Sequence, residues 1–434
     1  MLFIHGSLKL GGVETFFIRI AKARSEKGSK TKILLLSSRS NNDPGLVADA
    51  QKYADIYFFE ELLAEKVKFL VSVYPYHLSQ VAPLNNSTIE TVLSSVSHIH
   101  VSTSFSAYFA MRILNMTNKN IPITIGVYHS LEFLWGTQPF PFFERANRDF
   151  FYNKIDRKNI VFFNQGVIDL YEKKTAESFS YSKVFPLGVI DCTNLDVNID
   201  HEVSSPNRNM IKKLVIGSVG RLVAFKSYNM WMLDVIYQLK EQGVSVVYVV
   251  YGNGPIFQDM LDKVSELGLE KEVELKGNLN YSEFKRAVSK FDLFVGSGTA
   301  IVEAASLGVP SIIGIENIEE PMTYGFLNDI PGVAYNEDGL YAKKGVTDTI
   351  LDYVHSSNED KKQLSKAHVK KARLFSIQKC SDNFDSIKAT KIDSKYITAS
   401  SKLSSRLLYS LSFFVYSLSC RLKGSSFSKL TREV

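Results

Sequence analysis

Cysteine and histidine are scarce in this chain, and neither is arranged as a metal site. The 434 residues include three cysteines, Cys192, Cys380 and Cys420, and eight histidines that form no His-x-x-His cluster. Widely separated cysteines are typical of reduced thiols in the cytoplasm rather than of a disulfide framework. We therefore expect a cytoplasmic protein without a bound metal ion or cofactor.

Long apolar runs are also absent. No stretch of 18 uninterrupted apolar residues occurs, so the sequence predicts no membrane-spanning helix. Residues Met1 to His5 form a short apolar segment without a basic region before it, which argues against a secretory signal. No Gly-x-Gly-x-x-Gly turn follows this segment, so an oxidoreductase with a dinucleotide cofactor is not expected.

Acidic residues are few at the C-terminal end. Residues 388–434 contain nine Lys or Arg and two Asp or Glu, whereas the net charge of the whole chain is +6. The basic excess therefore belongs to this tail, and the rest of the chain is close to neutral. A body of this charge does not suggest a nucleic-acid partner.

The tail also has an amphipathic pattern. Leu407, Leu411, Phe414 and Leu418 recur at helical spacing, and Arg and Lys residues flank them. Such a segment is typical of a helix on an anionic membrane surface, so we expect peripheral membrane contact through residues 400–423. The alternative is a helix that packs on the body of the protein or on a partner.

Strand and helix signals alternate through the rest of the chain, which predicts parallel sheets covered by helices. The predicted class is α/β, with two Rossmann-like doubly wound domains facing each other across a cleft. The expected parts are a first domain (1–190), a polar interdomain linker (191–213), a second domain (214–370), a helix crossing back to the first domain (371–388) and a basic Ser-rich tail (389–434). In the first domain we expect strands at 2–5, 31–36, 56–59, 98–101, 123–128, 160–163 and 184–186.

Four segments of the second domain carry glycine where a predicted strand ends. They are Ile216–Arg221, Val246–Pro255, Val273–Gly277 and Asp292–Ala305. The carboxyl ends of parallel strands meet at one edge of a sheet, so we expect these turns to share one cleft. Glycine lets backbone N–H groups approach a phosphate closely, and the pattern therefore predicts a site for a nucleotide diphosphate.

Two cations and one carboxylate accompany these turns. Arg221 offers a planar charged fork and Lys226 a compact charge, and a cation about 4 Å from a phosphate gains roughly 4 kcal/mol at an effective dielectric of about 20. Glu303, three residues into a predicted helix, can accept hydrogen bonds from ribose hydroxyls. We expect the cations to bind the diphosphate and the glutamate to bind the ribose. The alternatives are solvated surface charges and a charge that only complements the helix dipole.

Taken in order, these motifs make residues 3 to 388 resemble a retaining glycosyltransferase of the GT-B fold, in the family 4 group (glycosyl transferases group 1). The motifs that carry the resemblance are Gly11-Gly12-Val13-Glu14, His129, Phe185 to Asp191, Gly220-Arg221 with Lys226, Gly252 to Pro255, and Glu303 with Gly308-Val309-Pro310. The resemblance implies that the first domain is the acceptor side and the second binds the nucleotide sugar.

The resemblance also implies roles for single residues. His129, Arg221 and Lys226 would act in catalysis, with His129 near the donor sugar. The glycines of the turns would lie against the donor, and Gly277 and Leu279 would lie near its nucleobase. The complete set of expected donor-binding residues is Gly11, Gly12, Gly254, Gly277, Leu279, Gly298, Thr299, Ala300 and Glu303.

One position departs from the family pattern. The family has two glutamates separated by seven residues; Glu303 fits the second, and Val295 occupies the place of the first. In the family the first glutamate contacts the donor sugar, and valine cannot accept a hydrogen bond. We therefore expect the backbone N–H groups of Gly298, Thr299 and Ala300 to take over recognition of the sugar.

The resemblance predicts a hexosyltransferase-like enzyme that needs no metal ion. It would move a sugar, with retention, to a glycan or lipid-linked acceptor at the inner face of a bacterial membrane, in the synthesis of surface polysaccharide such as the O-antigen of lipopolysaccharide. Two alternatives stay open, a non-catalytic nucleotide-binding scaffold, motivated by Val295, and a sugar-nucleotide epimerase. The sequence names neither the donor sugar and base nor the acceptor, linkage or oligomeric state.

Overall fold

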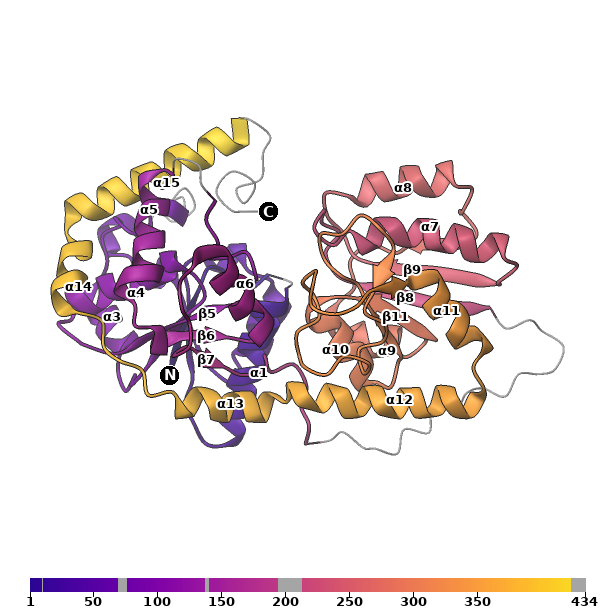
Figure 1. Ribbon diagram of the computed structural model, residues 1–434. Coiled ribbons are helices and arrows are strands. Elements are labelled where there is room, and N and C mark those ends of the chain that lie inside the picture. The colour runs from indigo at the N-terminus through magenta and orange to yellow at the C-terminus, as the bar shows by residue number, and fades with distance from the viewer. Residues whose placement is uncertain (10, 69–75, 137–139, 194–212, 423–434) are drawn as a thin grey trace. The chain divides into compact units, whose positions relative to one another are not determined.

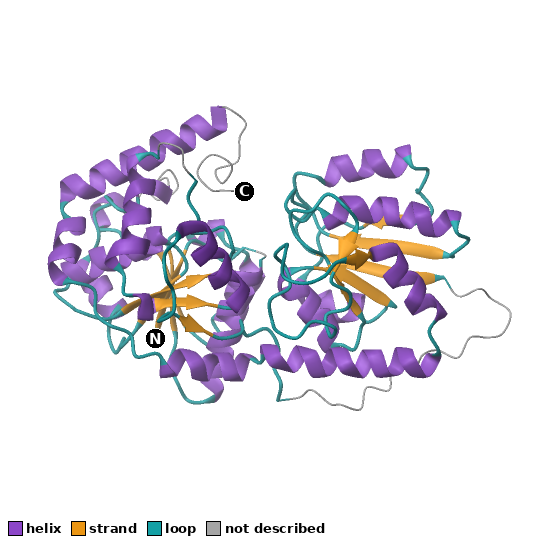
Figure 2. Ribbon diagram, in the orientation of Figure 1, coloured by secondary structure: helices purple, strands orange, loops and turns teal. Residues whose placement is uncertain are grey.

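The computed structural model describes residues 1–9, 11–68, 76–136, 140–193 and 213–422 (Figures 1 and 2). The chain folds into two compact units. Unit 1 consists of Met1–Leu187 and Gln378–Val434, and unit 2 of Gly188–Ile377. Most of the predicted linker, residues 194–212, lies outside the described residues.

Unit 1 is built on a seven-stranded parallel sheet with the order β3-β2-β1-β4-β5-β6-β7. The chain starts at β1 in the middle, moves outward to β3, and returns to the other side from β4 onward, which is the doubly wound pattern. The strands are β1 (Leu2–His5), β2 (Lys32–Leu35), β3 (Asp55–Phe58), β4 (Ile99–Val101), β5 (Ile123–Val127), β6 (Ile160–Phe162) and β7 (Lys183–Val184).

Helices cover the two faces of this sheet (Figure 2). Several begin at a side chain that accepts a backbone N–H, as Thr103 does for α4 and Asn164 for α6. The helices of the first segment are α1 (Gly12–Glu26), α2 (Pro44–Ala50), α3 (Asn86–Val92), α4 (Ser104–Met116), α5 (Phe142–Asp149) and α6 (Gln165–Thr175). Short 3-10 and π turns are η1 (Arg39–Asn41), η2 (Phe59–Leu62), η4 (Tyr76–Leu78), η5 (Phe150–Lys154) and η6 (Arg157–Asn159).

Unit 2 contains a five-stranded parallel sheet with the order β10-β9-β8-β11-β12, and a separate antiparallel pair, β13 and β14. The central strands are fully apolar, as in Val246-Val247-Tyr248-Val249-Val250, because helices cover both of their faces. The strands are β8 (Leu214–Val219), β9 (Val246–Tyr251), β10 (Val273–Leu275), β11 (Leu293–Gly296), β12 (Ser311–Ile313), β13 (Met322–Thr323) and β14 (Lys344–Gly345).

The helices of unit 2 alternate with its strands. They are α7 (Tyr228–Glu241), α8 (Phe257–Glu266), α9 (Phe284–Val288), α10 (Gly298–Ser306), α11 (Val346–His355) and α12 (Asn358–Ala372), with 3-10 turns η7 (Tyr281–Glu283) and η8 (Arg373–Phe375). Two apolar clusters, one on each side of the sheet, fill the space between helices and strands. The predicted class, two Rossmann-like doubly wound α/β domains, is thereby confirmed.

Element ends differ from prediction by one or two residues. The strand expected at 56–59 occupies 55–58, because Phe59 begins the turn η2. The strand expected at 184–186 is β7, which ends at Val184, two residues before Pro186. Proline has no N–H to donate to a sheet, which favours an early end.

The end of the chain returns to unit 1 as α13 (Ile377–Ser386), α14 (Ser394–Ser401) and α15 (Leu403–Leu422). Figure 1 shows α14 beside α4 and α15 along α5, in agreement with their contacts. The inner face of α15 is aromatic: the Phe413 ring stacks on Phe143 with centroids 4.7 Å apart, and the Tyr409 hydroxyl donates to Asn147 Oδ1 at 2.7 Å. One face of the amphipathic tail therefore packs on the body, while Leu407, Leu411, Phe414 and Leu418 are exposed.

Candidate functional site

The glycine turns of unit 2 meet at the carboxyl edge of its sheet, as their sequence positions predict. The Gly220 N–H, after β8, donates to Tyr251 O at 2.9 Å, and the Gly252 N–H, after β9, donates to Gly277 O at 2.8 Å. On the other side of β8, the Gly314 N–H after β12 donates to Gly296 O at 2.9 Å. The turns after five neighbouring strands thus form one continuous edge.

Close backbone packing explains why glycine is needed here. A Cβ added to Gly252 would lie 1.9 Å from Gly220 O, and one added to Gly254 would lie 2.1 Å from Leu222 O. Both neighbours are backbone atoms, which cannot rotate away as a side chain can. The first two turns are therefore held in close contact, with their N–H groups at the edge of the sheet.

Both predicted cations lie at this edge. Arg221 directly follows Gly220 and is exposed, whereas Lys226 is half-buried. The Lys226 ammonium would come within 3.2 Å of a Cβ at Gly220, so it lies over the first glycine turn. Positive charge beside glycine turns, where no Cβ blocks the approach of a ligand, is a suitable environment for a diphosphate.

The helix α10 begins at the same edge. Gly298, Thr299 and Ala300 form its first turn, and the N-terminal end of a helix carries a partial positive charge. Glu303 lies one turn further on, where its Oε2 accepts a hydrogen bond from the Tyr281 hydroxyl at 3.1 Å. Val295, in contrast, is fully buried in the apolar core below the turn.

A second carboxylate near this turn was not predicted from the sequence. Glu316 follows β12, and its Oε1 accepts a hydrogen bond from Ser297 Oγ at 2.6 Å. Burial raises the pKa of Glu316, while the Lys226 charge and the Ser297 hydrogen bond act in the opposite direction. Its position two residues beyond Gly314, at a strand end, is the signal that identifies it. Glu316 therefore places a carboxyl group between Lys226 and the start of α10.

Tyr335 and Asn336 hold the first turn of α10 in place through hydrogen bonds. Asn336 Oδ1 accepts from the Gly298 N–H at 2.9 Å, and the Tyr335 hydroxyl donates to Gly298 O at 2.7 Å. Burial, together with the nearby Glu316, raises the pKa of Glu337 to about 7. Two carboxyl groups with raised pKa values thus lie beside one glycine turn, a pattern typical of functional sites.

Glu337 is expected to make the free energy of unfolding depend on pH. Its pKa of about 7 in the folded chain lies above the ordinary value of 4.5, so the folded state binds more protons between these values. The free energy of unfolding should fall as pH rises from about 4.5 to 7, by up to about 3 kcal/mol. Urea unfolding at pH 5 and pH 7.5 should show this fall in the native chain and a smaller one in Glu337→Gln. Glu319→Gln, at an exposed position, is the control. An unchanged pH dependence in Glu337→Gln would show that the pKa of Glu337 is not the cause.

The predicted residues of unit 1 lie at the carboxyl ends of its central strands. Gly11 precedes α1 and Gly12 is its first residue, while His129 follows β5. His129 Nδ1 accepts the Leu131 N–H at 3.1 Å, so the ring is oriented by its own loop. The sequence reasoning missed His5, which ends β1; its Nε2 lies 3.7 Å from Glu14 Oε1. The structure thus brings His5 to the Gly11-Gly12 turn.

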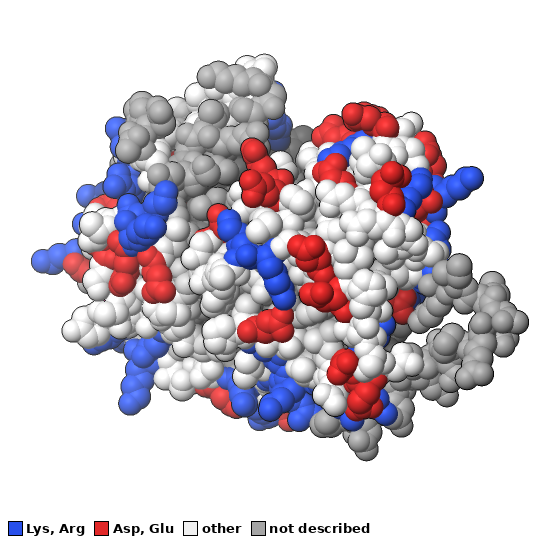
Figure 3. Space-filling view, turned by 45° about the vertical axis from the view of Figure 1, so that its right-hand side comes forward, with Lys and Arg blue, Asp and Glu red and all other residues white. Residues whose placement is uncertain are grey.

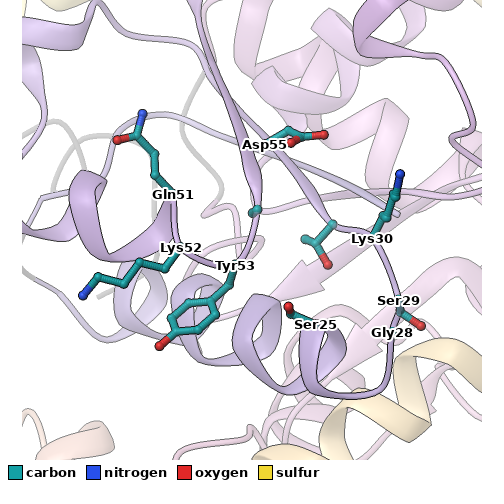
Figure 4. Close-up of a pocket in the computed structure, with 10 residues that line it drawn as sticks. Ser25, Gly28, Ser29, Lys30, Gln51, Lys52, Tyr53 and Asp55 are labelled. Atoms are coloured by element: carbon teal, nitrogen blue, oxygen red, sulfur yellow. The ribbon is translucent and has the colours of Figure 1, made fainter.

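A cavity of about 340 Å³ lies at the opposite edge of the unit 1 sheet (Figure 4). Lys30 and Tyr53, among its lining residues, precede β2 and β3. It therefore opens at the amino ends of these strands, away from the Gly11-Gly12 turn. In doubly wound sheets ligands bind at the carboxyl ends, so we do not assign the reaction to this cavity.

Within the described ranges, no group of three His, Cys, Asp or Glu side chains is arranged to hold a metal ion. The described helices also include none that is long and apolar enough to cross a bilayer. On the face shown in Figure 3, acidic and basic side chains are interspersed, as on an ordinary solvated surface.

Comparison with known proteins agrees with this geometry. Residues 202–317 match the family model for glycosyl transferases group 1. No curated protein matches the sequence. Among solved structures, Anabaena Alr3699/HepE in complex with UDP and glucose is similar at a TM-score of 0.60 and 14% identity, over 88% of this chain and 97% of that one.

Two further structures are similar over nearly their full lengths. Sucrose-phosphate synthase from Thermosynechococcus elongatus has a TM-score of 0.59 and 12% identity, covering 88% of this chain and 97% of its own. A glycosyltransferase from Rickettsia africae has a TM-score of 0.57 and 14% identity, covering 92% and 98%. At such identities the likeness establishes the fold alone. The family match covers the glycine turns, Arg221, Lys226 and Glu303 at the carboxyl edge of the unit 2 sheet. The chain therefore has the GT-B fold, and its residues 202–317 match the model of the glycosyl transferases group 1.

Proposed function

We propose that the protein transfers a sugar from a nucleotide-diphosphate sugar to a glycan or lipid-linked acceptor, with retention of configuration at the anomeric carbon. The observation that carries the proposal is the edge of unit 2 where glycine turns, Arg221, Lys226 and the start of α10 come together. Each of these groups favours a bound diphosphate, and Glu303 at the same edge suits a ribose.

In the proposed reaction, the bond between the anomeric carbon and the diphosphate oxygen breaks, and a bond from that carbon to the acceptor hydroxyl oxygen forms. The acceptor proton passes to the departing phosphate. Arg221 and Lys226 stabilise the negative charge that grows on the diphosphate, which is electrostatic catalysis by prearranged charges. His129 would contact the donor sugar.

Recognition of the donor sugar is assigned to two groups. Because Val295 is buried and apolar, the N–H groups of Thr299 and Ala300 would donate hydrogen bonds, as the sequence suggests. The Gly298 N–H, which the sequence also suggests, already donates to Asn336 Oδ1. Glu316 would supply the carboxylate that accepts hydrogen bonds from sugar hydroxyls, since its oxygen already faces the Ser297 hydroxyl at the start of α10. Hydrogen-bond donors and a hydrogen-bond acceptor for the sugar would then lie together at the start of α10.

Nucleotide-induced thermal stabilisation tests the site. UDP is the first nucleotide to try, because several similar structures contain it, and GDP and ADP serve for comparison. A nucleotide at about 100 times its dissociation constant adds roughly 2.7 kcal/mol of stability. We expect one nucleotide to stabilise the native chain and Arg221→Ala or Glu303→Ala to abolish the effect.

Turnover assays separate the alternatives. Stabilisation by a nucleotide with no sugar transfer across a broad panel of donors and acceptors would favour the scaffold. An epimer of the nucleotide sugar formed without acceptor would favour the epimerase. No stabilisation by any nucleotide would remove the basis of the proposal.

We also propose that the protein works at the inner face of the cell membrane, in surface-polysaccharide synthesis. The outward face of α15 supports this, because it exposes eight large apolar side chains: Leu403, Leu407, Leu408, Leu411, Phe414, Val415, Leu418 and Leu422. A patch of this kind is unusual on a protein that meets only water. Exposed Lys402 and Arg421 add positive charge at its two ends, which suits anionic lipid.

The double substitution Leu411→Ser with Val415→Ser is expected to reduce binding to vesicles that contain anionic lipid by about tenfold, since two of the exposed apolar contacts are lost. Co-sedimentation with vesicles measures the bound fraction. The matched control is Leu261→Ser, an exposed leucine on α8 of unit 2. Equal loss in the control, or no loss in the double variant, would contradict membrane contact through α15.

A further inference from the structure

A cavity of about 460 Å³ lies beneath the first turns of α15. Its lining comes from α4, α5, α14 and α15 together with Gln80, all in unit 1. This volume falls in the range of small-molecule binding sites. The cavity belongs to the tail and its support, so it is separate from the glycine turns of unit 2.

Four aromatic side chains line this cavity, and the hydroxyl groups of its three tyrosines already have partners. The hydroxyls of Tyr108 and Tyr396 share a hydrogen bond of 2.9 Å, and Tyr108 also donates to Ala146 O at 3.0 Å. The Tyr409 hydroxyl donates to Asn147. With these groups satisfied, the rings and Phe142 present apolar surface to the space, which suits a hydrocarbon chain.

A half-buried guanidinium also lines the cavity. Arg406 Nε donates to Ser401 O at 2.9 Å and Nη1 to Gln80 O at 2.8 Å, which fixes the group in place. Its Nη2 has no hydrogen-bond partner among the residues that the structure describes. A fixed guanidinium with a remaining donor is a strong site for a phosphate.

The charge around the cavity is positive. Arg145 lines its exposed side, and neither arginine forms an ion pair with a carboxylate in the described part of the chain. Asp149 is the one acidic residue among the described lining residues, and its Oδ2 lies 3.8 Å from Lys154 Nζ. An anionic group would therefore meet two arginines and one carboxylate that already has a cation nearby.

We propose that this cavity binds one anionic amphiphile of the membrane, with its hydrocarbon chain among the tyrosine rings and its phosphate on Arg406 and Arg145. The cavity is lined by the same helix, α15, whose other side exposes eight large apolar side chains, and we therefore take the source to be a lipid rather than free phosphate. The site would bind a single lipid molecule between α15 and the rest of unit 1, while the outer face of α15 contacts the bilayer. The proposal concerns unit 1 alone and does not depend on the reaction assigned to unit 2.

Binding of monomeric decyl phosphate to the full chain, followed by isothermal titration calorimetry, tests the site. Decyl maltoside has the same chain without the charge, and inorganic phosphate has the charge without the chain. We expect saturable binding of one decyl phosphate, binding of decyl maltoside weaker by about tenfold or more, and no measurable binding of phosphate. Equal binding of the two amphiphiles, or binding of phosphate as strong as that of decyl phosphate, would overturn the proposal.

Four substitutions locate the binding. Arg406→Gln should weaken decyl phosphate binding by about tenfold or more, as expected for one lost charge-assisted contact, and Arg406→Lys should restore part of it. Ala399→Trp places a large ring at the rim and should also weaken binding. Arg148→Gln is the matched control, since this exposed α5 arginine does not line the cavity. Unchanged binding in Ala399→Trp, with an unchanged melting temperature, would refute the location even if Arg406→Gln fails to fold.

Discussion

Replacing Lys226 or Arg221 by alanine is expected to lower kcat/KM for the nucleotide-sugar donor by about a hundred- to a thousandfold. This is the range seen when one group that stabilises a developing negative charge is removed. Lys226 is half-buried over the Gly220 turn, so its charge is screened less than that of the exposed Arg221. Of the two variants, Lys226→Ala should therefore lose more activity.

Steady-state turnover of the donor and nucleotide binding, measured together, check this expectation. Lys271→Ala is the control, because Lys271 is exposed and precedes β10 at the opposite edge of the sheet. If both site variants keep their activity while they still fold, the diphosphate does not bind at this edge. Loss of turnover with unchanged nucleotide affinity would show that the cations act mainly in the transition state.

Glu316→Gln is expected to lower turnover by about tenfold to a hundredfold while affinity for the free nucleotide diphosphate changes little. A hydrogen bond to a charged acceptor contributes about 1.5–3 kcal/mol, which corresponds to this range. Glutamine still offers an oxygen to the Ser297 hydroxyl, so the local structure should persist. The loss therefore reports the missing negative charge toward the sugar and Lys226.

The pH dependence of turnover distinguishes the possible roles of Glu316. Because burial raises its pKa, the carboxylate form should be lost on acidification at higher pH than for an ordinary glutamate, and kcat/KM should fall there in the native chain only. Exposed Glu320→Gln should behave as the native chain. If Glu316→Gln retains full activity and the same pH profile, the residue only supports Ser297. If Glu316→Gln also loses nucleotide binding, the Glu316 carboxyl group supports the diphosphate site rather than contacting the sugar.

The strand-end glycines could be placed from the sequence because chain direction fixes them. In a parallel sheet every strand ends at the same edge, so Gly220, Gly252 and Gly277 had to lie at one edge whatever the strand order. Glu316 could not be placed in this way. Its distance from Ser297 depends on β12 lying next to β11, with Val295 opposite Ile312, and neighbouring strands in a sheet are not encoded in local periodicity.

The tail shows a second limit of sequence reasoning. The helical pattern of Leu407, Leu411 and Phe414 predicts an apolar stripe, and these residues are indeed exposed. Tyr409, Phe413 and Tyr416 form another apolar stripe on the opposite side of the same helix, which packs on α5 and η4. When both sides of a helix are apolar, only tertiary contacts decide which one is covered.

The path of the chain has a consequence for the order of folding. Unit 1 is completed by residues from Gln378 onward: Asn159 Nδ2, just before β6, donates to Thr390 O at 2.7 Å, and the Tyr108 and Tyr396 hydroxyls share a hydrogen bond. Unit 2 is contiguous and has all of its residues once Ile377 has been synthesised. On the ribosome, unit 2 can therefore finish before unit 1, whose apolar surface on α4 and α5 stays uncovered until the last segment emerges. Truncation near the C-terminus would thus leave the N-terminal segment of unit 1 with its apolar surface uncovered and prone to aggregate.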